Sequence, residues 1–523
     1  MFLTHQSVQI RKALSVKVSH RFGVGSAVFD EDSLVSCAGL VPVMTLAEQA
    51  GLARLLDEKV RISAPRIKSG SANPAPKLAT LIAGMCAGAD CIDDIDVVHS
   101  GGMKALFDGV YAPSAVGTLL REFTFGHARQ LESVLREHLV GLCQRVDLLP
   151  GADQWVFVDV DSLLRPVYGH AKQGASYGHT KFGGKQILRK GLSPLATTIS
   201  TPGAAPVIAG MRLRAGKTGS GKGAGRMVAQ AIGTARAAGA HGQILVRGDS
   251  AYGNRKVVAA CLRAGAQFSL VMTRNPAIDR AIAAIDEAAW TPVRYPGAVR
   301  DPDTGAWISD AEVAEIGYTA FASTKDVTTA RLIVRRVKDA RYPDALFPVW
   351  RYHPFFTNST EPVVDADITH RKHAVIETVF ADLIDGPLAH MPSGRFGANY
   401  AWVLCAAITH NLLRDRRPRR RRARSRPRRH PASQDHQHPR PSGPPATPPD
   451  PAPAPPLALG RCLAHLVAQH NRLHATITRH PLTTGPHGPR PRPKWKSWPD
   501  QRLPHARTSQ KPHRWIEAKL LAA

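Results

Sequence analysis

Apolar residues recur at helical spacing through the first part of the chain. The segment TLAEQAGLARLLDEKV begins with Thr45 and Glu48 in capping-box spacing and continues with leucines at helix-like intervals. The pattern returns in PAPKLATLIAGMCAGA, MKALFDGVY, SAVGTLLREF and ARQLESVLREHLVGLC. We therefore predict a helical N-terminal region over residues 1–150, serving DNA binding or dimerisation. The two helices around the turn YAPS fit a helix-turn-helix, although packing within a bundle explains them equally well.

From residue 154 the pattern alternates between extended and helical segments. QWVFVDVDSLL, QILRKGLSPLATTIS and PVIAGMRLR read as strands and are followed by the helical GRMVAQAIGTARAAG. The strand QILVRGDS, the helix KVVAACLRAGA and the strand QFSLVMTRN come next. This order predicts a mixed α/β sheet over residues 151–275. In that order, the acidic groups at the ends of the first and fourth strands lie on adjacent strands.

The alternation stops in the next segment. Residues 276–365 contain one short helical pattern and then antiparallel strand patterns separated by Pro, Gly and Asp turns, so we predict a β-rich insertion. Residues 366–414 return to helices. The first of these, ADITHRKHAVIETVFADLIDG, has an apolar stripe at i, i+3, i+4 and i+7 that starts at Ile376. Glu377 lies at the edge of that stripe, in line with His370 and His373.

Charge is concentrated at the C-terminal end. The 523 residues include 69 Lys and Arg against 41 Asp and Glu, a formal net charge of +28. Residues 415–523 hold 23 of these basic residues, 5 of the acidic ones and 21 of the 41 prolines. We predict a basic, Pro/Arg-rich and mostly disordered tail, with one candidate helix at residues 457–479. The tail is either a phosphate-binding arm or the product of a shifted GC-rich reading frame.

Cysteine usage and hydropathy exclude several classes of protein. Seven cysteines are scattered without a CxxC pair, which indicates reduced thiols and neither a disulfide framework nor a zinc cage. The nearly uncharged stretch from Leu78 to Ala89 is far shorter than the ~18–20 residues of a membrane span. The first residues lack the apolar core and cleavage site of a signal peptide. We predict a soluble, cytoplasmic protein with no membrane partner.

Three acidic residues on separate elements suggest a metal site. Asp161 and Asp249 end the first and fourth strands, and Glu377 lies on the later helix. Phosphodiester chemistry uses two Mg²⁺ ions about 3.5–4 Å apart, and two or three carboxylates suffice to hold them. The pattern alone is weak, because a chain with 41 acidic residues also places capping or solvated carboxylates at strand ends.

Several motifs occur in a characteristic order: YGHAKQGASYGH, RGDSAYGN, RYHPFFTN, HRKHAVIETVFADL and MPSGRFGANYAWVLCAAITHNLLR. Together, over roughly residues 20–414, they resemble bacterial insertion-sequence transposases of the DDE class, and more narrowly the transposase DDE domain group 1 branch. The resemblance implies an RNase H-like catalytic domain, in two parts at residues 151–275 and 366–414, interrupted by the β-rich insertion.

The same resemblance implies the chemistry and the partners. The reaction would be metal-dependent cleavage at the ends of a mobile element and strand transfer into target DNA, with Mg²⁺ or Mn²⁺ as cofactor. The partners would be double-stranded DNA, both terminal inverted repeats and target, and a second copy of the chain in a homodimeric DNA complex. The location would be the cytoplasm, in association with the nucleoid.

The resemblance also assigns the acids. The first matches Asp161, which is followed by Ser162, with Asp159 on the same strand face as the alternative; the second matches Asp249 and the third Glu377. Related transposases carry Tyr, Arg and Lys at i−7, i−4 and i+7 from the Glu. Here these positions hold His370, His373 and Ile384, so a catalytically inactive DNA-binding remnant is the alternative. His370 and His373, with the nearby Arg371, are predicted phosphate contacts.

Basic and aromatic residues interleave in the segment 165–190, beside Asp161. Such interleaving is typical of nucleic-acid surfaces, and we predict DNA contact there rather than a merely solvated face. The predicted contacts are Lys172, Lys181, Lys185, Arg189 and Lys190. A zinc site at His353, His370 and His373 is less favoured, because no cysteine lies at ligand spacing.

A nucleotide-binding loop is the competing hypothesis. GKTGSGKG matches the G-x-x-x-x-G-K pattern through Gly216, Gly221 and Lys222, and it lies between a strand and a helix. Gly223 replaces the Ser or Thr that would hold Mg²⁺. A P-loop NTPase is therefore the less favoured alternative.

Overall fold

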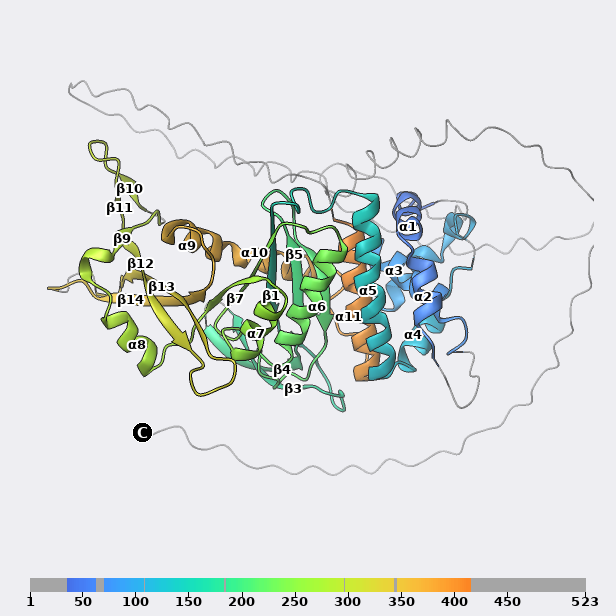
Figure 1. The fold of residues 1–523 in the computed structure, drawn as a ribbon. Helices are drawn as coiled ribbons and strands as arrows, with labels where there is room; N and C mark the ends of the chain where they lie inside the picture. Colours follow the sequence, from blue (N-terminus) through green and yellow to red (C-terminus); the bar gives the residue numbers. More distant parts are fainter. Residues whose placement is uncertain are drawn as a thin grey trace, which may run out of the picture. The chain divides into compact units, whose positions relative to one another are not determined.

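The computed structural model describes residues 35–62, 70–107, 109–182, 185–295, 297–342 and 346–414 (Figure 1). The side chains at positions 181, 182, 185 and 186 are outside this description. The predicted tail at 415–523, with its candidate helix, also lies outside the described residues. Within them, no helix is long and apolar enough to cross a membrane.

The helical pattern predicted for the N-terminal region is confirmed for those of its residues that the structure describes. The helices are α1 (Leu40–Gln49), α2 (Leu52–Lys59), α3 (Pro74–Cys86), α4 (Pro113–Arg121) and α5 (Phe125–Arg145), with 3₁₀ turns η1 (Asp93–Val98) and η2 (Gly101–Ala105). The predicted capping box at Thr45 is wrong, because its hydroxyl donates to the Val41 carbonyl inside α1. The upstream apolar residues extend that helix. Gly51, at φ 86°, separates α1 from α2.

Five strands form the part of the sheet that the alternating pattern predicts. They are β1 (Trp155–Ser162), β5 (Leu195–Ser200), β6 (Val207–Arg212), β7 (Gln243–Gly248) and β8 (Gln267–Val271). Their order is β6-β5-β1-β7-β8. Strand β5 pairs antiparallel with both β1 and β6, whereas β7 and β8 run parallel to β1. This order and these directions are the RNase H-like arrangement, so the predicted fold class is confirmed.

Helices cover this part of the sheet (Figure 1). Helix α6 (Ala224–Ala237) packs on β1, β5 and β6, and α7 (Arg255–Arg263) packs beside α6 and β8. The last helix, α11 (Phe396–Leu412), is buried along nearly its whole length and packs against β6, α3 and α5. Helix α11 thereby joins the N-terminal helices to the sheet in one hydrophobic core.

The segment 276–365 is β-rich, as its sequence pattern predicts. It contains α8 (Pro276–Ala283), η3 (Glu287–Ala289), the short strands β9 (Thr291–Pro292), β10 (Val299–Arg300) and β11 (Trp307–Ile308), and the long strands β12 (Ala311–Ala320), β13 (Thr328–Lys338) and β14 (Trp350–Thr357). Strand β14 pairs with β8, and the order continues β14-β13-β12-β9. The insertion therefore extends the same sheet to nine strands.

A small second sheet lies between β1 and β5 in the sequence. It consists of β2 (Arg165–Pro166), β3 (Ser176–Phe182) and β4 (Lys185–Leu192). The segment QILRKGLSPLATTIS, predicted as one strand, is split at Ser193 and Pro194 into β4 and β5, which belong to different sheets. Buried Arg214 binds both the carbonyl and the hydroxyl of Ser193, which fixes the chain between the two strands.

The helix predicted over 366–386 is interrupted. It forms α9 (Val363–Arg371), a 3₁₀ turn η4 (Lys372–Ala374) and α10 (Val375–Ile384). The Nδ1 atom of His373 lies 2.7 Å from the His370 carbonyl oxygen, where an α-helix would place a backbone N–H. The predicted apolar stripe is confirmed, since Ile376 and its partners along α10 are buried.

Candidate active site

Two of the three predicted acids lie side by side at one edge of the sheet. Strands β1 and β7 are parallel, and Val160 is in register with Gly248, so Asp161 and Asp249 follow at matching positions. Neighbouring strands are about 4.8 Å apart. Buried Tyr252 reports the same proximity: burial, and then the charges of Asp161 and Asp249, raise the pKa of its phenol far above the usual value. The structure thus brings these two carboxylates together.

Local backbone contacts orient both carboxylates. The Ser162 N–H donates to Asp161 Oδ1 at 2.6 Å, and the Ala251 N–H donates to Asp249 Oδ1 at 2.9 Å. The turn after Asp249 depends on Gly253, because a Cβ there would lie 2.1 Å from the Val271 carbonyl oxygen. The motif GDSAYGN therefore folds into a tight turn that holds Asp249 at the strand end.

Glu377 reaches the same neighbourhood from a helix. It is exposed on α10, whose opposite face is buried, and α10 packs beside β1. Glu377 forms no ion pair or hydrogen bond with any residue that the structure describes. The oxygens of Asp161, Asp249 and Glu377 are not all within 4.8 Å of one another. Carboxylates from two adjacent strand ends and a nearby helix are still a suitable donor set for hard divalent cations.

Asp159, the alternative first acid, has a different environment. It is 1% exposed and forms a two-point ion pair with Arg247, at 2.8 Å to Nε and 2.9 Å to Nη2. Arg247 also donates to the Thr369 carbonyl of α9 and stacks over the Phe157 ring at 4.1 Å. The charge of Asp159 is therefore balanced by Arg247 inside the fold, which favours Asp161 as the acid available to a metal.

Arg247 is the residue of this neighbourhood that the sequence interpretation missed. Its guanidinium connects β1, β7 and α9, the elements that carry or precede the three acids. A basic residue within a buried strand, two positions before Asp249, is the signal that could have revealed it, because a buried charge requires a partner. The partner itself could not be read from the sequence.

The predicted phosphate contacts on α9 and η4 differ in how far their side chains are buried. His370 is 5% exposed, stacks on Phe355 with ring centroids 4.2 Å apart, and lies 2.8 Å from the Ser269 hydroxyl. Burial holds its pKa well below the ordinary value, so the ring is neutral. The prediction that His370 contacts DNA is incompatible with this position, because the ring belongs to the core. Arg371 pairs with buried Asp367 at 2.9 Å, and His373 is half-buried.

The predicted DNA-contact segment around β3 and β4 is more open. Tyr168 and Tyr177 are 79% and 67% exposed. Arg189 is exposed, whereas Lys172 and Lys190 are half-buried. The side chains of the other two predicted contacts, Lys181 and Lys185, lie outside the description. The segment therefore keeps the exposed basic and aromatic groups that single-stranded or duplex DNA could contact.

The loop that matches the nucleotide-binding pattern is built around an arginine. Arg214, 7% exposed, donates through Nη1 to the carbonyl oxygens of Gly219, Ser220 and Lys222, at 3.4, 2.7 and 3.1 Å. A phosphate cradle needs converging backbone N–H groups. Here the converging groups are carbonyls and they bind a cation, which argues against the P-loop alternative.

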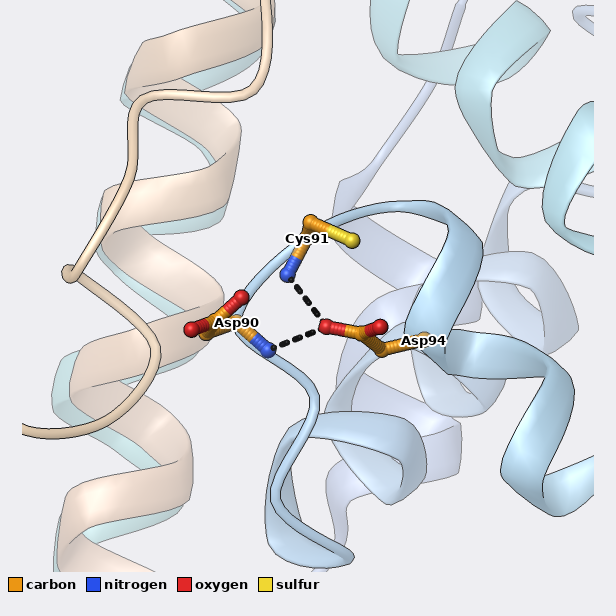
Figure 2. Close-up of side chains that lie close together, drawn as sticks. All are labelled: Asp90, Cys91 and Asp94. Carbon is orange, nitrogen blue, oxygen red and sulfur yellow. Dashed lines mark hydrogen bonds between the residues drawn. The ribbon is translucent and has the colours of Figure 1, made fainter. Parts of the chain in front are cut away.

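A cluster of possible metal ligands occurs elsewhere, at the start of η1 (Figure 2). Asp90, Cys91 and Asp94 are the described group whose donor atoms lie within 4.8 Å of one another. The Asp94 carboxylate accepts the backbone N–H groups of Asp90 and Cys91, at 3.3 and 3.2 Å. These bonds tie the Asp94 side chain to the backbone that precedes it, and we assign no metal to the cluster.

Comparisons with known proteins agree with the resemblance in the motifs. Residues 25–422 match the family model described as transposase DDE domain group 1. No curated protein matches the chain. Among solved structures, the chain is similar to one from a cryo-EM structure of a piggyBac transposase synaptic complex with hairpin DNA, at 9% identity and a TM-score of 0.35, covering 73% of this chain and 74% of that one.

Proposed function

This chain belongs to the transposase DDE domain group 1 family, and from that premise we propose that it cleaves DNA at insertion-sequence ends and transfers the strands into target DNA. The observation that supports this most is the pairing of Asp161 and Asp249 at the ends of parallel strands β1 and β7. Glu377, on a helix beside β1, supplies the third acid. The family generally uses divalent metal ions, and we propose Mg²⁺ or Mn²⁺.

We assign the roles as follows. Asp161, Asp249 and Glu377 would hold the divalent ions, which when bound stabilise charge on the attacking and leaving oxygens of the phosphodiester. Backbone N–H groups orient one oxygen of each aspartate. Tyr252 is fully buried beside both aspartates and excludes water from that side of the pair. The orientation of the two aspartates is therefore fixed by the fold before DNA binds.

We propose that DNA is positioned by the segment around β3 and β4, which leaves β1 directly after Asp161. Its exposed tyrosines and arginine can contact bases and phosphates. The partners would be the terminal inverted repeats and the target duplex, in a complex with two copies of the chain. The N-terminal helices would contribute to end recognition or dimerisation.

A second candidate function is DNA binding without cleavage. One observation favours it: the position at i−7 from Glu377, a Tyr in related transposases, holds His370 in the core of this protein. A DNA contact that relatives make from this position is then missing. The paired aspartates at the sheet edge favour the cleaving enzyme.

A nicking assay tests the choice. The substrate is DNA carrying the terminal inverted repeats of the element, and the readout is strand cleavage with Mg²⁺, with Mn²⁺ and with a chelator. We expect cleavage with either metal, and loss of cleavage with retained DNA binding in Asp249→Asn. Asp153→Asn is the matched control, because Asp153 is exposed just before β1, at the opposite edge of the sheet. Equal cleavage by Asp249→Asn and wild type would refute the assignment.

A further inference from the structure

An arginine-rich cluster surrounds one buried glutamate on α5. Glu132 is 4% exposed and accepts hydrogen bonds from Arg129, Arg212 and the Tyr400 hydroxyl. Arg136 lies 3.9 Å from the same carboxylate and forms no hydrogen bond with a described residue. Three guanidinium groups from α5 and β6 therefore share a single carboxylate.

The positive charge of this cluster exceeds its negative charge. Arg226, exposed on α6, adds a fourth guanidinium without any ion pair to a described residue. Burial, and then the charges of Arg212 and Arg226 among others, lower the pKa of Arg129, which shows mutual repulsion. The next acid along α5, Glu137, is held by Lys59 at 2.8 Å. Like charges held together destabilise a fold unless an anion joins them.

The cluster faces the same edge of the sheet as the candidate acids. Ser162, next to Asp161, is in register with Leu195, which is in register with Arg212. Two strand spacings of about 4.8 Å put the Arg212 backbone about 10 Å from that of Ser162. Side chains alternate between the two faces along a strand, so Arg212 and Asp161 project from opposite faces at the same end of the sheet. A duplex that passes over this end of the sheet can contact both.

Contacts also connect the cluster to the segment proposed to hold DNA. The Gln173 N–H donates to the Gly394 carbonyl, and its side chain accepts the Phe396 N–H at 3.0 Å. Phe396 packs edge-on against Tyr400, whose hydroxyl reaches Glu132. A continuous chain of contacts therefore runs from the loop before β3 through the start of α11 to the arginines of α5.

We propose that Arg129, Arg136, Arg212 and Arg226, the α5 arginine track, bind the phosphate backbone of the DNA duplex whose end lies at the acids. Arg129 and Arg136 are seven residues apart on α5, so they lie on one helix face about 10 Å apart and can follow several phosphates. Arg129 and Arg212 are anchored by Glu132, which leaves Arg136 and Arg226 as the main phosphate contacts. The inference rests on the proposed function for the identity of its partner.

Salt dependence of binding tests the track without knowledge of the element's sequence. The probe is a short duplex of arbitrary sequence, because counterion release does not depend on sequence, and the readout is the slope of log K against log salt. For Arg136→Gln with Arg226→Gln we expect the slope to fall by about 2, or about 1 for each phosphate that the variant no longer neutralises. An unchanged slope would overturn the proposal.

The matched control removes the same charge at the opposite edge of the sheet. Arg145 at the end of α5 and Arg263 at the end of α7 are exposed and have no ion pair with a described residue. Arg145→Gln with Arg263→Gln should keep the wild-type slope; a fall equal to that of the track variant would mean that only net charge matters, and would overturn the proposal. If the track pair impairs folding, the single variant Arg226→Gln should still lower the slope by about 1.

The proposal of DNA cleavage and the proposal of the α5 arginine track can be tested separately with the same variants. Asp249→Asn should lose nicking and keep the wild-type salt slope, whereas the track variant should show the reduced slope. If the wild-type protein does not nick DNA but the slopes still differ, the track stands and the cleavage proposal fails. If the wild-type protein nicks DNA and the track variant has the wild-type slope, the cleavage proposal stands and the track proposal fails.

Discussion

Charged side chains inside the sheet are paired with an opposite charge, whereas several of those at its edge are not. Inside, Asp159 is matched by Arg247, with both side chains almost fully buried. At the edge where β1 and β7 end, Asp249 and Glu377 form no ion pair with a described residue, and exposed Arg226 forms neither an ion pair nor a hydrogen bond with one. A buried charge must be paired to be tolerated, whereas a charge at the solvent edge remains available to a ligand.

The β-rich insertion gives a second example of matched charge. Arg336, 5% exposed, bonds Glu312 at 2.6 Å and Glu287 at 2.9 Å, and its guanidinium lies between the rings of Trp290 and Trp350 at 4.3 and 4.4 Å. This arginine faces two carboxylates, while Glu132 faces three arginines. In a chain this basic, the local balance of charge separates structural arginines from those that can bind phosphate.

Substituting the two aspartates of β1 one at a time should give the largest contrast. Asp161→Asn should lower the nicking rate on the order of a thousandfold with little change in melting temperature, because metal ligation supplies several kcal/mol of barrier reduction. Asp159→Asn should instead lower the melting temperature, since Arg247 loses its charged partner. Nicking rates and thermal unfolding of both variants check this. If Asp159→Asn melts like wild type and fails to nick, the first acid has been misassigned.

Removing the buried arginine should produce the next largest effect. Arg247→Leu should lower the free energy of unfolding by about 3–5 kcal/mol, because Asp159 is left buried and unpaired. The double variant Asp159→Leu with Arg247→Leu should lose less than the sum of the two single variants. Urea unfolding measures all three. Strict additivity would show that the ion pair contributes no coupling between β1 and β7.

Acid should destabilise the protein through two buried histidines. Burial lowers the pKa of His138 and of His410 from 6.5 to about 4, so both rings are neutral in the fold. Because the unfolded chain binds these protons at higher pH, stability is full above pH 6.5 and falls as the pH drops toward 4. Between pH 7 and pH 5 we expect a loss on the order of 2 kcal/mol per histidine.

Histidine variants sharpen this test. In urea unfolding, His138→Gln should remove about half of the acid-induced loss that the two buried rings cause. His241→Gln is the control, because His241 is exposed before β7. Acid sensitivity that is the same in wild type and both variants would contradict the role of the buried ring.

The smallest effect is expected at the loop after β6. Lys222 is exposed, and the loop is fixed by the carbonyl bonds to Arg214. Lys222→Ala should leave the melting temperature unchanged. We expect no nucleotide hydrolysis in either the wild type or the variant. A colorimetric phosphate-release assay checks this, and ATP hydrolysis that disappears in the variant would restore the P-loop alternative.

Local patterns in the sequence predicted most elements of the fold because those elements bury one apolar face. The helices α3 and α5, the strand β1 and the apolar stripe of α10 follow from periodicity alone, whereas the RNase H-like order of the strands follows from the family resemblance. Errors arose where tertiary contacts compete with local signals. Thr45 was predicted to cap a helix that continues upstream of it, and the helix over 366–386 is interrupted where His373 reaches the His370 carbonyl.

The candidate site divides in the same way. Strand order alone made Asp161 and Asp249 neighbours, because the first and fourth strands of this order are adjacent. The phosphate contact predicted for His370 is incompatible with its burial, because helical spacing cannot show that Phe355 of β14 covers the ring. The cluster around Glu132 was not predicted at all, since its members come from α5, β6 and α11.

The sequence by itself determined the family, the RNase H-like order of elements and the three acids to consider. Only the tertiary structure decided that Asp159 is neutralised, since its partner Arg247 lies 88 residues away on a parallel strand. It likewise decided that arginines gather around Glu132, 80 residues from Arg212. Periodicity records which face of an element avoids water, but the pairing of charges depends on which elements the completed sheet brings together.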